Sequence, residues 1–283
     1  MHNRDIHVLK YFSSFVSVSE GKIINITEPT LTFCPLASRL YKEFRLIPKN
    51  DKDVLKGAIK KVIQSKIRDY GFFTENRKFS FKDVVIPYGA SEIISFALRK
   101  KAVEAAVVVC EGAGTVITDK PDIVQGIGAR MNSLLLTSPI KKIIHNLKSA
   151  GCILVFESAL IDQARGVKEA IKSGYKTIAV TVCGHSAEDL KIIRSLEKEY
   201  GVSIICLVVC TTGVSRDKIN MIRDYADLAW SCASSDARRI IGTVAILQLS
   251  RQIPVFVLTK KGVDFVSGYA RENEPERKFV HSG

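Results

Sequence analysis

The sequence has no apolar run as long as the ~18 residues that a helix needs to cross a bilayer. Residues 1–7 are mixed in character, and no sustained apolar segment with a small-residue cleavage site follows them. A secretory signal is therefore not indicated. We expect a cytoplasmic protein without a membrane partner.

The seven cysteines are odd in number and irregularly spaced, which argues against a disulfide framework. Cys152, Cys183 and Cys206 stand in apolar stretches, where a reduced cysteine packs as a small hydrophobe. The chain also lacks Cys-x-x-Cys and His-x-x-x-His, the close spacings typical of zinc sites. We expect reduced thiols in a reducing compartment, and no metal site.

The 283 residues suffice for one large domain or two smaller ones, and 46% apolar and 25% charged residues are typical of a globular protein. Most of the net charge of +13 lies near the N-terminus, because residues 1–82 hold 16 Lys and Arg against 8 Asp and Glu, a net of +8. The stretch from Lys49 to Lys66 is the most basic. It is either a solvated helix face or a surface for an acidic partner or an anionic cofactor.

The first 82 residues predict a basic α+β lobe. Residues 21–26 and 30–33 have the composition of short strands, with Glu28 and Pro29 as the turn between them. Apolar residues recur at helical spacing over 51–70, and Gly71 follows as a stop signal.

From Val84 onward, strand, loop and helix patterns alternate, which favours an α/β fold. We predict a mostly parallel sheet with helices on its faces in residues 83–283, beside the smaller lobe of residues 1–82. The expected strands begin at Val84 and then cover 105–110, 133–136, 153–156, 177–182, 203–209, 227–231 and 255–258. The expected helices cover 90–100, 140–149, 160–173, 187–200, 216–225 and 236–250.

Two valine-rich strands each end in a cysteine followed by a loop of small residues. One is 107–117, which delivers Cys110 and Glu111 into a glycine-bearing loop, and the other is 207–214, which delivers Cys210. In a parallel sheet such loops meet at the carboxyl edge, where ligands of α/β proteins usually bind. We therefore predict the functional site at that edge.

Two glycine-bearing segments are candidate anion cradles, since glycine lets backbone N–H groups approach a phosphate or carboxylate closely. The residues assigned to anion binding are Gly112, Gly114, Thr115, Gln125, Gly126, Gly128 and Arg130. Arg130 would clamp the anion, and Thr211, Thr212 and Gly213 of the second loop would add donors. Neither segment is a Walker A loop or a full dinucleotide fingerprint. Ordinary tight turns explain both equally well.

Candidate catalytic residues are Cys110, Cys210 and Glu111. A helix N-terminus lowers a thiol pKa, so a cysteine between a strand and a helix can be a nucleophile, and Cys232 shares this setting. The alternative is a small buried residue. Among the histidines His185 is best placed for acid–base work, but no Ser-His-Asp grouping is visible.

Nine strings together resemble the methanogenesis marker protein 8 family, over about residues 20 to 265. They are Cys34-Pro-Leu, Tyr88-Gly-Ala-Ser-Glu92, Cys110-Glu-Gly-Ala-Gly-Thr-Val-Ile117, Gln125-Gly-Ile-Gly-Ala-Arg130, Thr137-Ser-Pro-Ile140, Ile161-Asp-Gln163, Gly174-Tyr-Lys-Thr-Ile-Ala-Val-Thr181, Thr211-Thr-Gly213 and Cys232-Ala-Ser234. Glu111 and Ala129 depart from the usual aspartate and glycine. The resemblance implies a cytoplasmic protein of anaerobic, methane-forming archaea, and it transfers no reaction and no catalytic residues.

Three functions follow from these patterns. The first is an accessory protein or enzyme of methanogenesis that binds an anionic coenzyme- or nucleotide-like molecule at the sheet edge, with thiol chemistry if it catalyses a reaction. The second is a non-catalytic assembly factor that docks on a partner protein through Lys56, Lys60 and Lys61. The third, nucleic-acid binding, is the least supported, because the basic lobe carries no recognised motif. The sequence identifies no cofactor and leaves open whether the protein is an enzyme.

Overall fold

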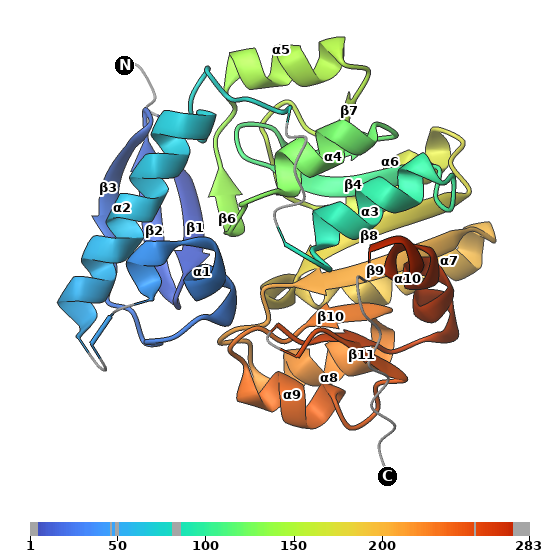
Figure 1. The fold of residues 1–283 in the computed structure, drawn as a ribbon. Coiled ribbons are helices and arrows are strands. Elements are labelled where there is room, and N and C mark those ends of the chain that lie inside the picture. Colours follow the sequence, from blue (N-terminus) through green and yellow to red (C-terminus); the bar gives the residue numbers. More distant parts are fainter. Residues whose placement is uncertain (1–4, 46, 49–50, 81–85, 252, 274–283) are drawn as a thin grey trace.

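The computed structural model describes residues 5–45, 47–48, 51–80, 86–251 and 253–273, which form two β-sheets with helices packed on them (Figure 1). The smaller sheet has the order β3-β2-β1-β6, and its neighbours all pair antiparallel. Its strands are β1 (His7–Tyr11), β2 (Ser14–Ser19), β3 (Lys22–Ile26) and β6 (Ser133–Thr137). Because β6 comes from the second part of the chain, the N-terminal lobe and the α/β part share this sheet.

Helix α2 (Lys52–Tyr70) packs on one face of the smaller sheet (Figure 1). Asp51 caps its N-terminus by accepting a hydrogen bond from the Val54 N–H, and Gly71 ends it with φ +70°, a conformation that glycine adopts without strain. Leu55, Ile59 and Ile63 form its buried stripe, as the helical periodicity predicts. A short helix, α1 (Pro35–Leu40), and the 3₁₀ turn η1 (Lys42–Phe44) complete the lobe.

The larger sheet has the order β11-β12-β10-β9-β8-β4-β5-β7. Its strands are β4 (Ala105–Cys110), β5 (Gly114–Thr118), β7 (Ile153–Leu154), β8 (Thr177–Cys183), β9 (Ser203–Val209), β10 (Leu228–Trp230), β11 (Leu247–Leu249) and β12 (Val255–Val257). Strands β4, β8, β9 and β10 pair parallel, whereas β5, β7, β11 and β12 add antiparallel pairs at the two sides. The sheet is therefore mixed, and the predicted mostly parallel sheet is limited to its four central strands.

Helices cover both faces of the larger sheet. One apolar core contains side chains of α3 (Ala90–Arg99), α4 (Pro121–Gly128), α5 (Lys141–Ser149) and α10 (Lys260–Asn273). The other contains side chains of α6 (Gln163–Lys172), α7 (Asp189–Tyr200), α8 (Arg216–Tyr225) and α9 (Ser235–Ile241). In β9, Ile205 and Leu207 belong to the first core and Ile204, Cys206 and Val208 to the second, which explains why this strand is apolar throughout.

Several predicted elements differ from the structure. The hairpin strands β1 and β2 were not predicted, residues 30–33 form no strand, and the helix expected over 236–250 ends at Ile241, before β11. After β4 the predicted glycine loop leads into the antiparallel strand β5 and then into α4, and neither β5 nor α4 was predicted. Residues 84–85 of the strand expected from Val84 lie outside the described residues, and residues 86–88 form a bend and a turn rather than a strand. No helix in the described part of the chain has the length and apolar character needed to span a bilayer.

Candidate functional site

A cavity of about 260 Å³ lies between the smaller sheet and the carboxyl edge of the central parallel strands. From the lobe it is lined by residues of the β1–β2 hairpin, of α1 and of α2. From the α/β part it is lined by residues 128–134 and by residues at or just after the ends of β8, β9 and β10. These elements can be followed in Figure 1, with α1 and β1 facing the strand ends. The predicted location of the site, at the carboxyl edge, coincides with this cavity.

Four cysteines line the cavity: Cys34, Cys183, Cys210 and Cys232. Burial raises the pKa of all four thiols, that of Cys210 to about 12. The Ser133 side chain makes hydrogen bonds that partly oppose this effect at Cys183 and Cys210. The cavity wall therefore presents neutral thiols at pH 7, which are polarisable and weakly polar.

The backbone around the cavity adopts unusual conformations. Cys183 pairs in register with Val209, so the next residue, Cys210, would point to the other face of a regular sheet. Cys210 instead has φ +62°, and its thiol lies in the same cavity as Cys183. Positive φ angles also occur at the lining residues Phe12, Ser13, Arg130 and Cys232. Such conformations cost ~1–3 kcal/mol each and concentrate at functional sites.

Lys10 connects the two parts of the molecule at the cavity rim. Its Nζ lies 3.0 Å from His185 Nε2, which accepts the hydrogen bond. Burial lowers the pKa of both groups, and the Lys10 charge lowers the pKa of His185 further. His185 therefore stays neutral at pH 7, and the Lys10 amine lies near the thiols of Cys183 and Cys210.

Lys66 is the most deeply buried cationic side chain of the cavity, with only 2% of its surface exposed. Its Nζ donates hydrogen bonds to the Arg130 carbonyl oxygen at 2.6 Å and to Asn132 Oδ1 at 2.5 Å. It lies 5.4 Å from the ring centroids of both Tyr11 and Tyr41. Burial, followed by the Arg130 charge, lowers the pKa of Lys66 to about 7.

Two polar atoms near Lys66, the Tyr41 hydroxyl and Arg130 Nε, are buried and have no well-aligned hydrogen-bond partner among the described residues, although the Arg130 guanidinium lies close enough to the hydroxyl to lower its pKa. Burial raises the pKa of Tyr41 to about 12, an effect that the adjacent Arg130 guanidinium partly offsets. A buried polar group without a partner costs about 1–3 kcal/mol, so both atoms are suited to a ligand. Glu92, which also lines the cavity, accepts a hydrogen bond from Ser91 Oγ at 2.9 Å.

Some of the residues predicted from the sequence line this cavity, namely Cys210, Thr212, Gly128 and Arg130. Gly213 lies beside it, because a Cβ at this position would be 3.3 Å from Lys10 Nζ. Thr211 is fully buried and donates its hydroxyl proton to the Trp230 carbonyl oxygen at 2.7 Å.

The first glycine loop, which was predicted as an anion cradle, is a buried hairpin turn between β4 and β5 and does not line the cavity. The Gly112 N–H donates to Thr137 Oγ1 at 2.7 Å, and a Cβ on Gly114 would overlap the Ala159 carbonyl oxygen. Thr115 is fully buried and donates to Gln163 Oε1 at 3.0 Å. The turn needs glycine because it packs tightly against the neighbouring chain.

The predicted catalytic pair Cys110 and Glu111 is also enclosed. Both side chains are fully buried away from the cavity lining. Burial, and then the Glu111 charge, raises the pKa of the Cys110 thiol well above its usual value. Glu111 forms an ion pair with Arg77, whose guanidinium stacks 3.9 Å from the Phe72 ring centroid. This pair joins the hairpin turn to the lobe, and we assign it a structural role.

The second glycine segment is part of helix α4 and not a loop. A Cβ on Gly126 would overlap the Phe79 carbonyl oxygen, so this glycine permits close packing of two chain segments. Gln125 is nearly buried and donates from Nε2 to Glu92 Oε1 at 3.2 Å. Arg130 follows this helix and lines the cavity, so its predicted role in anion binding is compatible with the geometry.

Sequence reasoning missed Lys10, Lys66, Tyr41 and Ser133 as cavity residues. Lys66 follows the apolar residues Ile59 and Ile63 at helical spacing, so it is a lysine on the buried stripe of α2. That signal was available in the sequence. No group of three or more His, Cys, Asp or Glu side chains in the described part of the chain is arranged to hold a metal ion.

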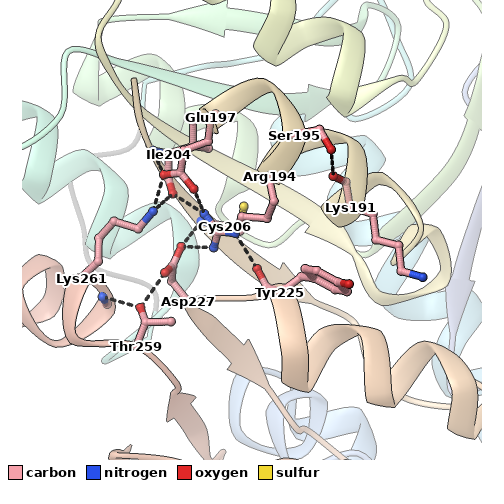
Figure 2. A network of polar contacts seen from close by, with 11 residues as sticks. Lys191, Arg194, Ser195, Glu197, Ile204, Cys206, Tyr225, Asp227, Thr259 and Lys261 are labelled. Carbon is pink, nitrogen blue, oxygen red and sulfur yellow. Dashed lines mark hydrogen bonds and ion pairs between the residues drawn. The ribbon is translucent and has the colours of Figure 1, made fainter. Parts of the chain in front are cut away.

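A polar network outside the cavity lies at the opposite, amino edge of the larger sheet (Figure 2). Arg194 bridges Glu197 Oε2 at 2.7 Å and Asp227 Oδ2 at 2.6 Å. Asp227 also accepts the Cys206 N–H at 2.8 Å and the Thr259 hydroxyl at 2.5 Å. Every group faces another protein group, so the network fixes β9, β10 and α10 and offers no ligand site.

Residues 7–271 match the family described as "Uncharacterized protein conserved in archaea (DUF2099)". The chain belongs to this family. It is also similar to an uncharacterised protein of Methanocaldococcus jannaschii, with 35% identity over 270 residues that cover 95% of this chain and 92% of the relative. The DUF2099 match spans all the elements that line the cavity.

Proposed function

We propose that this protein binds a small anionic molecule, a coenzyme or a coenzyme fragment, in the cavity between its two sheets. The observation that carries the proposal is a pair of basic side chains, the buried Lys66 and the half-buried Arg130, beside the buried Tyr41 hydroxyl. Burying cationic groups costs free energy that an anionic ligand would recover.

Charge and size both limit the ligand. The lining holds three basic side chains, Lys10, Lys66 and Arg130, against one acidic side chain among the described residues, Glu92, so an anion gains a net attraction. A volume of about 260 Å³ lies below the ~300–1,000 Å³ of pockets for drug-sized ligands. The ligand we propose is therefore a small acid or a phosphorylated fragment and not a whole dinucleotide.

The thiols contribute a second recognition element. Cys183, Cys210 and Cys232 stand where the reactive or apolar part of a ligand would contact the strand ends. Their raised pKa values mean that thiolate chemistry requires the ligand or Lys10 to stabilise the ionised sulfur. Whether the bound molecule reacts or is only carried decides whether the protein is an enzyme.

The resemblance to the methanogenesis marker protein 8 family, together with a relative from Methanocaldococcus jannaschii, supports a cytoplasmic role in methanogenesis. Within that proposal the ligand is a coenzyme-like anion of the pathway. An accessory role and a catalytic role use the same cavity.

Native and denaturing mass spectrometry of protein purified without oxygen tests this proposal. A discrete mass that is present in the native spectrum, lost on denaturation and anionic when recovered is the expected result. The recovered compound should bind the Arg130→Ala variant more weakly by about 1.5–3 kcal/mol, because a charge-assisted hydrogen bond is lost.

Arg165→Ala on α6 is the matched control, since Arg165 is exposed and does not line the cavity. It should retain wild-type affinity. Equal affinities of both variants would remove Arg130 from the site. A bare chain that also binds none of the small carboxylates or phosphates offered to it would contradict the proposal.

A second candidate is docking on an acidic partner protein through α2. Lys60 and Lys61 are exposed and form no ion pair among the described residues, whereas Lys56 is paired with Glu28 at 2.5 Å. Charge reversal of Lys60 and Lys61 should abolish such an interaction and leave ligand binding intact. If Arg130→Ala abolishes binding of the partner protein and charge reversal of Lys60 and Lys61 does not, docking through α2 is contradicted.

A further inference from the structure

Resting on the function proposed above, we further propose that the ligand is a carbonyl compound and that Lys66 Nζ condenses with it to form an imine. The ligand class is then a 2-oxo acid or an aldehyde that bears a carboxylate or phosphate. Three features of the cavity lead to this assignment: the hydrogen bonds of the amine, its surroundings and the two buried polar groups beside it. The reaction also balances without a further reactant.

The hydrogen bonds of Lys66 leave one direction of the amine unused. Nζ donates to two acceptors, the Arg130 carbonyl oxygen and Asn132 Oδ1. A neutral primary amine has two N–H donors and one lone pair, so these acceptors use both donors. The lone pair then occupies the remaining tetrahedral position of the amine, and Lys66 is one of the residues that line the cavity.

Burial is the largest influence on the Lys66 amine, which is 2% exposed, and burial favours the neutral form. The Arg130 and Arg77 guanidinium groups act in the same direction. The Glu111 carboxylate and the faces of the Tyr11 and Tyr41 rings favour the cation, but the pKa remains lowered on balance. With a pKa of about 7, roughly half of the Lys66 amines are unprotonated at pH 7, against ~0.03% for a lysine at 10.5.

The two buried polar groups specify what else the ligand carries. Arg130 Nε would bind a carboxylate or phosphate oxygen close to the reacting carbon, as guanidinium groups commonly do. The Tyr41 hydroxyl has a raised pKa, remains protonated at pH 7 and can donate to the carbonyl oxygen. An acid group next to a carbonyl group is the pattern that uses both donors and the amine.

The reaction is balanced without an oxidant or a reductant. The Lys66 lone pair attacks the carbonyl carbon, and a C–N bond forms while the C=O π bond opens to a hydroxyl group. Both amine protons and the carbonyl oxygen then leave as water, and a C=N bond remains. Imine formation removes the two hydrogen bonds that Lys66 Nζ donates to the Arg130 carbonyl oxygen and to Asn132 Oδ1. These two oxygens would then accept hydrogen bonds from the ligand or from water.

Reductive trapping tests the assignment with pyridoxal 5′-phosphate, an anionic aldehyde, as the probe. The full-length protein is incubated with the probe across pH 6–10 and reduced with sodium borohydride, and the modified lysines are located by peptide mass spectrometry. We expect Lys66 to be labelled at least about tenfold faster than exposed lysines at pH 7, with a rate midpoint near pH 7. Preferential labelling of exposed lysines with a midpoint above pH 9 would overturn the assignment.

Three variants and one unreactive analogue complete the test. Lys66→Met and Lys66→Arg should both lose this labelling, and Lys61→Arg on the exposed face of the same helix should keep it. Pyridoxine 5′-phosphate has an alcohol in place of the aldehyde and reports binding without condensation. If the analogue binds the wild type but binds Arg130→Ala weakly, and no aldehyde is trapped at Lys66, the imine proposal is wrong and the proposed anion site is retained. Failure of both binding and trapping would count against both proposals.

Discussion

Cys210, Cys232 and Arg130 all have positive φ angles and all line one cavity. None of these residue types adopts that conformation readily, so the surrounding structure must impose it. At Cys210 the consequence is visible, because the turn directs its thiol to the side of Cys183. At the scale of single residues, the site is therefore built by backbone geometry as much as by side-chain type.

The Cys210 thiol should be unreactive in the folded, ligand-free protein. Its pKa of about 12, against an ordinary 9.0, leaves about a thousandfold less thiolate at pH 8. We expect iodoacetamide to modify Cys210 far more slowly in native protein than in urea-unfolded protein, followed by peptide mass spectrometry. Similar rates in the two states would show that Cys210 is ionised or freely exposed.

The ion pair of Arg77 and Glu111 should be essential for stability, because both side chains are fully buried. Glu111→Gln removes the carboxylate that pairs with the buried Arg77 charge and should lower the free energy of unfolding by about 3–5 kcal/mol. Glu169→Gln, in the partly exposed pair with Arg165, should cost less than about 1 kcal/mol. Urea denaturation of both variants measures the difference, and equal costs would contradict the structural role of Glu111.

At the scale of elements, the sequence predicted best where the pattern was long or apolar on both faces. Strand β9 and helix α8 have the predicted bounds, and α2 begins one residue later than predicted. Strands β1 and β2 were missed, since their connection at Phe12 and Ser13 contains no glycine although both residues have positive φ angles. The glycines of residues 125–130 were misread as a loop because close packing also selects glycine.

Two helical glycines should respond in opposite ways to alanine. A Cβ added to Gly57 in α2 would meet no atom within 4 Å, so Gly57→Ala should stabilise the protein by ~0.5–1 kcal/mol. In α4 the Cβ of Gly126→Ala would overlap the Phe79 carbonyl oxygen and should cost at least about 2 kcal/mol. Thermal or urea unfolding compares them, and a destabilised Gly57→Ala with a neutral Gly126→Ala would refute this packing.

At the scale of the whole molecule, the cavity joins segments that are distant in sequence. Lys10 and Lys66 come from the lobe, whereas Cys183 and Cys210 come from the parallel strands. The sequence placed the site at the carboxyl edge, where parallel strands end together, and the cavity lies at this edge. It could not predict that β6 would join the smaller sheet and place Ser133 beside these thiols, since such a pairing depends on contacts more than 100 residues apart in sequence.

This assembly should give the protein a characteristic dependence of stability on pH. The pKa of Lys66 is about 7 in the folded protein and 10.5 in its ordinary state. Between these values the unfolded chain holds a proton that the folded chain has released, so the Lys66 contribution to the free energy of unfolding rises with pH. The seven thiols act in the opposite direction above pH 9, because burial raises their pKa values in the folded state.

Comparing the wild type with Lys66→Met isolates the lysine, since the thiols are common to both proteins. The difference in unfolding free energy, wild type minus variant, should increase by about 2 kcal/mol from pH 7 to pH 9. Urea denaturation at intervals of half a pH unit measures it, with Lys61→Met as the exposed control on the same helix. A flat difference for Lys66→Met would mean that the Lys66 amine has its ordinary pKa in the folded protein. The amine would then be protonated at pH 7 and would lack the lone pair on which imine formation depends.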